Sequence, residues 1–332
     1  MKISVVIPAH NRPDFLLEAA ASLAAQTYTQ WEAVVIDDGS SPPLPFDRLE
    51  PVLGKNALYL RHETAQGVSR TKNVGIAAAT GEIITILDDD DLLMETALET
   101  IAIAFSRQPD LDCLFLGVEP FGPYASNPAA NRKAAIDSIV QRTRPIEIEG
   151  IYRFGENLFS EFLRSVPIDF QRPAARRGAW NIVGGLDENG LFSESSWTIK
   201  ASTLCRIGLT RAALTRWRIH DSNFGWQSGG DRNLAILRQL DNGLITTRSL
   251  TDDFKRREAA LARQLRLIEI HLAESYFSKA YFLRDKDKPS GIRALGSSFR
   301  LCPRPRHLKL FFSYLLTPLK NSTVDTDGST SQ

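Results

Sequence analysis

An alternation of short apolar runs with helical segments over the first 120 residues constrains the fold more than any other feature. Five apolar runs have the length of strands and cover 3–7, 32–36, 57–62, 82–87 and 111–122. Helical patterns stand between them, at 13–25, 69–79 and 93–105. Strands that alternate with helices of this length require right-handed crossovers. The pattern therefore predicts an α/β fold with a mainly parallel sheet and helices on both faces.

The remainder of the chain divides less clearly. Residues 127–177 are mixed in polarity and interrupted by prolines, which indicates an excursion that covers a site, with helices near 133–142 and 157–164. A Gly-Gly turn then leads to an acidic loop, a helix and a short strand that ends at His220. We expect a first domain over 1–225 and a helical region over 226–332, with one helix from 252 to about 286.

Polar residues follow three of the apolar runs. "PAHNR" covers 8–12, "DDGS" covers 37–40, and four aspartates cover 88–91. In open α/β sheets, ligands bind beyond the carboxyl ends of the strands. The sequence therefore predicts that these three segments converge on one edge of the sheet and form a ligand site there.

The four consecutive aspartates repel one another, so the cluster requires a compensating cation. The structural alternative is that they only cap a helix at Leu92. A calcium loop of the EF-hand type is disfavoured, because Leu92 stands where the next ligand belongs. The interpretation that remains is Mg²⁺ or Mn²⁺, held by few carboxylates and completed by a phosphate-bearing ligand.

Composition sets limits on partners and compartment. Forty basic residues against thirty-nine acidic ones give a net charge of +1, so no global field favours nucleic acid as a partner. Three cysteines without a CxxC spacing indicate a reducing compartment, and we expect a cytoplasmic protein. Residues 306–320 carry an apolar stretch between basic flanks. This segment is either a last helix packed on the core or a helix that makes peripheral contact with the inner face of a membrane.

Four segments in order, "ISVVIPAHNR", "VIDDGS", "GVSRTKNVGIAAATGEIITILDDDD" and "GGLDENGLFSE", resemble the family-2 glycosyltransferases over about residues 2–225. The resemblance implies the GT-A fold, followed here by a C-terminal helical region. It also implies a nucleotide-sugar donor, with a UDP-sugar favoured, a Mn²⁺ or Mg²⁺ ion, and inversion at the anomeric carbon. Residues 1–120 would then be the nucleotide-binding half and 121–225 the acceptor half.

The resemblance also implies roles for individual residues. The nucleotide-sugar-binding residues would be Pro8, Ala9, His10, Asn11, Arg12, Asp38, Arg70, Asp88 and Asp89. Among these, Asp38 would receive the N3 hydrogen of a uracil-type base, and Asp90 and His220 would bind the metal. Each of three residues also has a simpler role that stays open. Asp38 would only fix the 39–41 turn through an Asx hydrogen bond, Arg70 would be a solvated helix residue, and His220 would be a surface or core histidine.

The expected catalytic base is the point at which the sequence departs from the family. Members commonly carry an aspartate shortly after the Gly-Gly turn, but here Glu194 is followed by Ser195 and Ser196. Inverting transfer requires a group that takes the proton of the acceptor hydroxyl. Glu194 itself is the favoured base, because a carboxylate one position away on a loop can reach the same point. Asp187 or Glu188 is the alternative. Trp197 is either a residue that stacks on the acceptor sugar or a core tryptophan.

The sequence thus favours an inverting glycosyltransferase that acts on a saccharide or lipid-linked saccharide in the synthesis of a surface polysaccharide. The second hypothesis is a catalytically degenerate homologue that binds nucleotide sugars without transferring the sugar. A nucleotidyltransferase is a third and weaker hypothesis, because no glycine-rich phosphate loop with a lysine is evident.

Overall fold

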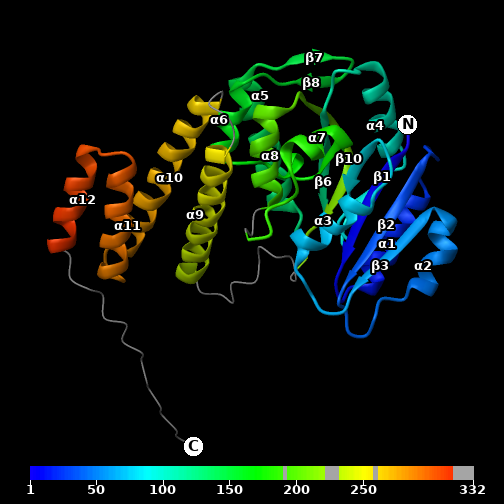
Figure 1. Cartoon of the computed structure of the whole chain (residues 1–332), viewed down its shortest axis with the longest axis horizontal. Coiled ribbons are helices and arrows are strands. Elements are labelled where there is room, and N and C mark those ends of the chain that lie inside the picture. Colours follow the sequence, from blue (N-terminus) through cyan, green and yellow to red (C-terminus); the bar gives the residue numbers. More distant parts are fainter. Residues whose placement is uncertain (190–192, 221–231, 257–260, 317–332) are drawn as a thin grey trace, which may run out of the picture. The chain divides into compact units, whose positions relative to one another are not determined.

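The computed structural model describes residues 1–189, 193–220, 232–256 and 261–316 (Figure 1). The chain forms two compact units, Met1–Gly229 and Gly230–Gln332. Each unit has its own hydrophobic core. The boundary expected at 225/226 lies outside the described residues.

The first unit is built on a mixed sheet in the order β3-β2-β1-β4-β9-β6-β10-β8-β7, with β5 paired to β10. Six strands share one direction: β1 (Ile3–Ala9), β2 (Trp31–Asp38), β3 (Ala57–His62), β4 (Ile83–Ile86), β6 (Cys113–Phe121) and β10 (Ile207–Arg218). β2 and β4 are parallel to β1, β3 is parallel to β2, and β10 is parallel to β6. The prediction of a mainly parallel sheet is confirmed for these strands.

The 127–177 segment contributes strands that the sequence did not predict. β9 (Pro173–Arg176) lies between β4 and β6 and is antiparallel to both, so it joins the two parallel parts of the sheet. The hairpin of β7 (Ile146–Ile148) and β8 (Ile151–Arg153) extends the sheet at β10 (Figure 1). These strands have three or four residues, which is too short for a clear two-residue period. The two helices predicted here are present as α5 (Ser126–Thr143) and α6 (Asn157–Arg164).

Helices cover both faces of the parallel strands. Ile3, Val5 and Ile7 share a core with α1 (Pro13–Ala24) and α4 (Ala97–Arg107), while α3 (Val68–Ala78) packs on the other face. A Cβ atom at Gly75 of α3 would stand 2.3 Å from Val6 Cγ1, so only glycine permits this close approach. Strands buried on both faces read as continuous apolar runs, which is why the sequence shows them so plainly.

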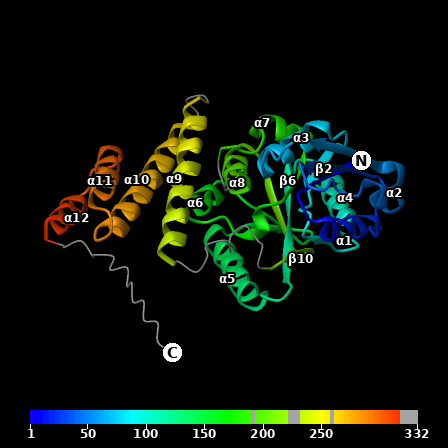
Figure 2. The same ribbon diagram turned by 90° about the horizontal axis from the view of Figure 1, so that it is seen from below.

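The unit has further helices and turns. They are α2 (Phe46–Leu53), α7 (Arg177–Val183) and α8 (Ser193–Leu204), together with the 3₁₀ turns η1 (Gly54–Asn56) and η2 (Ile168–Phe170). Both views of the molecule show α7 and α8 next to each other (Figures 1 and 2).

The segment after the aspartates differs from the expected helix over 93–105. β5 (Leu92–Leu93) pairs with Arg216 and Thr215 of β10, and α4 begins only at Ala97, after Thr96. The aspartates therefore do not cap a helix. Pairing with a strand more than 120 residues away overrides the local helical pattern, and no local signal announces it.

In the described part of the second unit there are four helices: α9 (Arg232–Arg256), α10 (Ala262–Leu283), α11 (Lys288–Leu301) and α12 (Pro305–Leu316). α10 lies between α9 and α11 in both views (Figures 1 and 2). The single helix expected over 252–286 is wrong, because Asp252 lies near the end of α9 and a separate helix starts at Ala262. Among the described helices, none is both long and apolar enough to cross a bilayer.

Candidate functional site

The ends of β1, β2 and β4 lie side by side and bring three polar segments together. The backbone N–H of His10 points to Asp89 Oδ2 at 3.3 Å, and His10 Nδ1 lies 2.7 Å from the carbonyl oxygen of Asp38. Asn11, with a positive φ of 54°, donates its backbone N–H to Ser40 Oγ at 2.9 Å. The three segments thus converge at the carboxyl edge of the sheet, as predicted.

Two cations that the sequence reasoning missed hold Asp88 and Asp91. Lys72 of α3 places its Nζ 2.7 Å from Asp88 Oδ1. Arg172, which follows η2, places Nη2 2.6 Å from Asp88 Oδ2 and 2.7 Å from Asp91 Oδ2. Part of the positive charge that the cluster requires therefore comes from the chain itself. No local pattern marks these two residues, since they lie 16 and 84 positions from Asp88.

Asp89 and Asp90 face a different cation. Arg12 Nη1 lies 3.2 Å from Asp89 Oδ1 and 2.6 Å from Asp90 Oδ2. His220 Nε2 approaches the same Asp90 oxygen at 3.2 Å, so the structure brings the two predicted metal ligands together. Arg12 and His220 therefore contact the same carboxylate oxygen of Asp90.

The pKa values show that the charges of the cluster are unevenly compensated. Burial raises the pKa of Asp89 to about 7, and the neighbouring carboxylates add to the effect. Burial also raises the pKa of Asp91 to about 7, although Arg172 opposes it. Burial acts on Asp88 in the same direction, but Lys72 and Arg172 outweigh it and hold the Asp88 pKa well below its usual range.

Asp38 organises the loop that leads into α3. Its Oδ1 accepts hydrogen bonds from His62 Nδ1 at 2.8 Å and from the backbone N–H of Gln66 at 2.7 Å, and Oδ2 accepts one from the backbone N–H of Gly67 at 2.9 Å. Burial opposes the ionisation of Asp38, but these hydrogen bonds outweigh burial and lower its pKa. Asp38 is thus fixed as an anion at the site edge.

The 39–41 turn is held by Asp37 rather than by Asp38. Asp37 Oδ1 accepts the backbone N–H of Ser40 at 2.8 Å, and Arg61 pairs with Asp37 Oδ2. The simpler role considered for Asp38 therefore belongs to its neighbour. Arg70 is exposed on the first turn of α3, close in sequence to the loop that Asp38 holds. Pro8 and Ala9 are buried residues of β1.

Glu194 lies in the first turn of α8 and reaches the same cluster through Lys72. Lys72 Nζ stands 2.5 Å from Glu194 Oε1, so one ammonium joins Glu194 to Asp88. Burial opposes the ionisation of Glu194, but Lys72 outweighs it and lowers the pKa. This keeps Glu194 in the ionised form that a base requires and weakens it as a proton acceptor for as long as Lys72 stays in place.

The other predicted acceptor residues, Asp187, Glu188 and Trp197, lie in different surroundings. Asn73 Nδ2 donates to Glu188 Oε1 at 2.9 Å, and Asp187 Oδ1 accepts the backbone N–H of Asn189 at 3.0 Å. Trp197 is only 1% exposed, and its ring centroid lies 4.3 Å from that of Trp180. A sugar has no access to this ring, so the structure corrects the acceptor role of Trp197 and makes it a core tryptophan.

The carboxyl edge at which residues 10–12, 38–40 and 88–91 meet is called the donor corner below. Its metal-binding side chains suit a metal ion that brings most of its own ligands. Within the described parts of the chain, no group of three or more His, Cys, Asp or Glu side chains has the geometry of a metal site. Asp90 and His220 provide one carboxylate oxygen and one imidazole nitrogen in contact with each other. Mg²⁺ and Mn²⁺ are commonly held by one or two protein ligands and completed by phosphates, and this pair fits that arrangement.

Residues 4–159 match the family model described as glycosyl transferase family 2. The matched segment begins within β1, extends past β8 and contains the whole aspartate run, so this part of the chain is similar to the family-2 glycosyltransferases.

The curated relatives cover parts of the chain. A glycosyltransferase of Streptococcus pneumoniae, GlyG, is 36% identical over 100 residues, which are 30% of this chain and 33% of that protein. A Campylobacter jejuni protein named GalNAc(5)-diNAcBac-PP-undecaprenol beta-1,3-glucosyltransferase is 35% identical over 102 residues, again 30% of this chain and 33% of the relative. The chain thus spans about a third of the length of these relatives.

Solved structures match over most of the chain and show the fold. TarS 1–349 of S. aureus in complex with UDP-GlcNAc has a TM-score of 0.63 at 18% identity, covering 93% of this chain and 84% of that one. The mannosyltransferase PcManGT from Pyrobaculum calidifontis, in complex with GDP-Man and Mn²⁺, has a TM-score of 0.55 at 15% identity, covering 95% and 79%. The chain therefore has a fold that these nucleotide-sugar complexes share.

Proposed function

We propose that the chain is an inverting glycosyltransferase. It would move a sugar from a nucleotide-diphosphate sugar, with UDP as the favoured nucleotide, to a saccharide or lipid-linked saccharide in the synthesis of a surface polysaccharide. The observation that carries the proposal is the convergence of His10–Arg12, Asp38 and Asp88–Asp91 at one edge of a parallel sheet in a chain similar to the family-2 glycosyltransferases. The name of the Campylobacter jejuni relative, which gives an undecaprenol-linked saccharide, supports the acceptor class.

The donor would lie along this edge with its base near the loop that Asp38 holds. Asp38 is fixed as an anion there and can accept the N3–H of a uracil-type base. Asp88 would face the ribose, and Arg70 would approach the base or the phosphates from the start of α3. His10, Asn11 and Arg12 would form the floor, with Pro8 and Ala9 positioning them from β1.

Asp90 and His220 would hold the Mn²⁺ or Mg²⁺ ion, which when bound neutralises charge on the departing nucleoside diphosphate. Arg12 has a second part in this arrangement. Its guanidinium, which lies 2.6 Å from Asp90 Oδ2, would face the phosphates of the donor, to which arginine binds well.

Glu194 would take the proton of the acceptor hydroxyl as the hydroxyl attacks the anomeric carbon. Lys72 contacts both Asp88 and Glu194, so a change at the donor side reaches the base through a single ammonium. Asp187 or Glu188 remains the alternative base.

The test is a panel of nucleotide sugars with Mn²⁺, assayed for released nucleoside diphosphate with and without EDTA and with saccharide acceptors. We expect release that depends on one donor, on acceptor and on metal. Binding of a nucleotide sugar by calorimetry without any release would favour the degenerate homologue instead.

A second proposal concerns the second unit: α12 would contact an anionic membrane surface. Four of its apolar side chains are largely exposed, namely Leu308 (58%), Phe312 (59%), Leu315 (66%) and Leu316 (84%). From 288 to 316 the sequence has six Lys and Arg residues and no Asp or Glu. Apolar side chains bordered by basic ones suit a surface of anionic lipid, where each basic residue contributes about 1 kcal/mol.

Flotation with vesicles of anionic or neutral phospholipid tests this surface. The exposed residues Phe312 and Leu316 are replaced by serine, which spares the buried Leu310 and Tyr314. We expect the wild-type chain to float with anionic vesicles and the double variant to stay at the bottom. Equal flotation of both chains, or none with the wild type, would contradict the proposal.

A further inference from the structure

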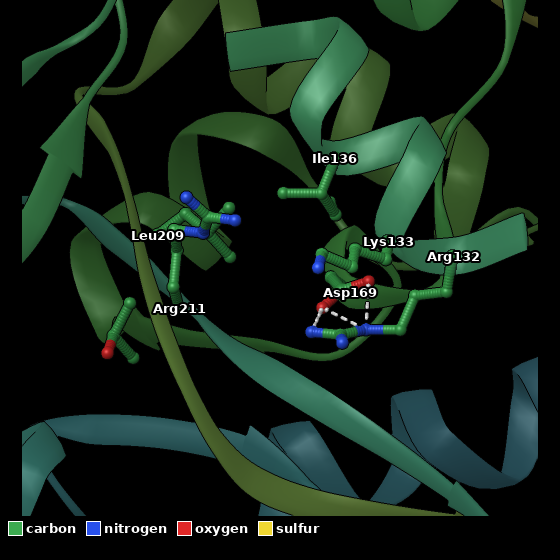
Figure 3. Close-up of a pocket in the computed structure, with 7 residues that line it drawn as sticks. Arg132, Lys133, Ile136, Asp169, Leu209 and Arg211 are labelled. Carbon is green, nitrogen blue, oxygen red and sulfur yellow. Dashed lines mark hydrogen bonds and ion pairs between the residues drawn. The ribbon is translucent and has the colours of Figure 1, made fainter. Parts of the chain in front are cut away.

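A cavity of about 180 Å³ lies between α5, the η2 turn and β10 (Figure 3). Its lining contributes three cationic side chains, Arg132, Lys133 and Arg211, and one carboxylate, Asp169. The formal charge of the lining is therefore +2. None of the residues placed in the donor corner lines this cavity.

Asp169 is neutralised within the wall. Arg132 Nη2 lies 2.6 Å and Nε 2.9 Å from Asp169 Oδ1, and the backbone N–H of Val118 donates to the same oxygen at 3.1 Å. Asp169 is only 2% exposed. A buried carboxylate with this many donors is a fixed part of the structure. The excess positive charge of the cavity thus belongs to Lys133 and Arg211.

Lys133 and Arg211 stand on opposite sides of the cavity (Figure 3). Arg211 Nη2 pairs with Asp137 Oδ1 at 2.7 Å, but both side chains are nearly half exposed, so water screens this pair. Across the ranges that the structure describes, Lys133 forms no ion pair with a carboxylate. Two cations that face one space with little compensation favour an anionic ligand between them.

The volume of the cavity limits that ligand. About 180 Å³ is the space of roughly six water molecules and lies below the 300–1,000 Å³ typical of pockets for whole drug-sized ligands. The cavity thus suits one compact group rather than a nucleotide sugar. Ile136 and Leu209 supply an apolar wall, and Thr210 also lines the cavity. A phosphate or a carboxylate on a small carbon skeleton matches this lining.

The cavity also lies near the donor corner along the chain. Asp169 precedes Arg172 by three residues, and Arg172 holds Asp88 and Asp91. Three residues span at most about 11 Å, so the wall of the cavity and the corner share one short segment. A group bound in the cavity would lie on the side of the acceptor half.

We propose that this cavity binds a phosphate or carboxylate group through Lys133 and Arg211, and that in the transfer reaction this group belongs to the acceptor. The assignment to the acceptor rests on the proposed function. The anion site itself does not.

Calorimetric titration of the full chain with inorganic phosphate and with acetate tests the anion site directly. Lys133→Gln and Arg211→Gln should each weaken binding about 10-fold or more, because each removes a charge-assisted hydrogen bond. Lys133→Arg keeps the charge and should bind within about threefold of wild type. Lys55→Gln, an exposed lysine of η1, is the matched control. Absence of binding to the wild type, or equal binding by the double glutamine variant, would overturn the site.

Steady-state kinetics test the assignment to the acceptor. With an acceptor that carries a phosphate or carboxylate group, the two glutamine variants should raise the acceptor KM about 10-fold and leave the donor KM unchanged. With a neutral acceptor they should change neither value. An unchanged acceptor KM with the charged acceptor would overturn the assignment. No turnover with any donor would remove the proposed function, whereas the phosphate titration decides the anion site by itself.

Discussion

The four consecutive aspartates form two pairs that are bound by different cations, although all four are adjacent in sequence. The inner pair, Asp88 and Asp91, is bound by Arg172, whose side chain is only 13% exposed. Asp91 is fully buried and also accepts the backbone N–H of Arg218 at 2.9 Å. The inner pair is thus bound by groups from distant parts of the chain.

The outer pair, Asp89 and Asp90, is bound by Arg12, which is more exposed than Arg172. Arg12 is 30% exposed, and its guanidinium approaches Asp90 together with the imidazole of His220. The comparison teaches that four identical residues divide by their partners: Asp88 and Asp91 share Arg172, whereas Asp89 and Asp90 share Arg12. The partner rather than burial decides this division, because the Asp88 side chain is 19% exposed and those of Asp89 and Asp90 are 8% and 11% exposed.

Removal of Arg172 should have the largest effect and tests the inner pair. Arg172→Gln leaves two buried carboxylates without their shared cation, which typically costs about 3–5 kcal/mol. We expect a loss of this size in the unfolding free energy, measured by urea denaturation. Arg107→Gln is the control, because Arg107 and its partner Glu149 are 61% and 50% exposed. That change should cost less than about 1 kcal/mol. A similar small loss for Arg172→Gln would remove the distinction between the two pairs.

Asp90→Asn tests the outer pair. The neutral amide should lower turnover about 10²- to 10³-fold, since it removes the carboxylate proposed to hold the metal at the diphosphate. The unfolding free energy should change by less than about 1 kcal/mol, because Arg12 can remain in solvent. Nucleoside diphosphate release and urea denaturation give the two values, with the exposed Asp47→Asn as control. A loss of stability with turnover intact would reverse the roles of the two pairs.

Glu194→Gln tests whether Lys72 connects the inner pair to the base. We expect sugar transfer to fall about 100-fold, which is the lower range for loss of a general base, with donor affinity near normal. Single-turnover assays and calorimetry separate the two effects. Glu188→Gln, at the alternative base, should leave transfer within about threefold. Retained transfer in Glu194→Gln with loss in Glu188→Gln would move the base to the loop after the Gly-Gly turn.

Glu32, at the start of β2, is a carboxylate outside the donor corner, and its replacement should have the smallest effect of the four. Burial opposes its ionisation, but hydrogen bonds from Lys2, Ser4 and Thr80 outweigh burial and lower its pKa from 4.5 to about 2. Its contribution to stability is therefore complete above about pH 4.5 and disappears as the pH falls towards 2. Thermal unfolding of wild type and Glu32→Gln should differ at pH 6 and converge near pH 2. A difference that does not depend on pH would exclude ionisation as its cause.

Much of the fold could be predicted because its strands are buried on both faces. Apolar runs, turn residues and helical periods located five of the six parallel strands and the helices α1 and α3 within a few residues. The sixth strand, β10, was expected to be short and to end at His220, but it has 12 residues and covers Ile207–Arg218. The three-residue and four-residue strands at 146–176 could not be predicted, since a strand of that length has no measurable period. The helix after the aspartates began four residues late because Leu92 and Leu93 pair with β10 instead.

The candidate site was predicted in part for a related reason. Residues that directly follow a strand lie at its carboxyl end, so the place of His10, Asp38 and Asp88 could be inferred from order alone. The roles proposed for them remain predictions. Lys72 and Arg172 could not be found in this way, because no pattern in a helix or a proline-rich segment shows which distant carboxylate a cation will meet.

The sequence by itself determined the alternating architecture and the edge at which polar residues gather, because these depend on local periodicity and on chain order. Only the tertiary structure decided which aspartates are neutralised, that Glu194 shares Lys72 with Asp88, and that Trp197 is core. Those outcomes depend on distances between segments that are far apart in the chain, and Coulomb energies and burial follow distance in space rather than position in sequence.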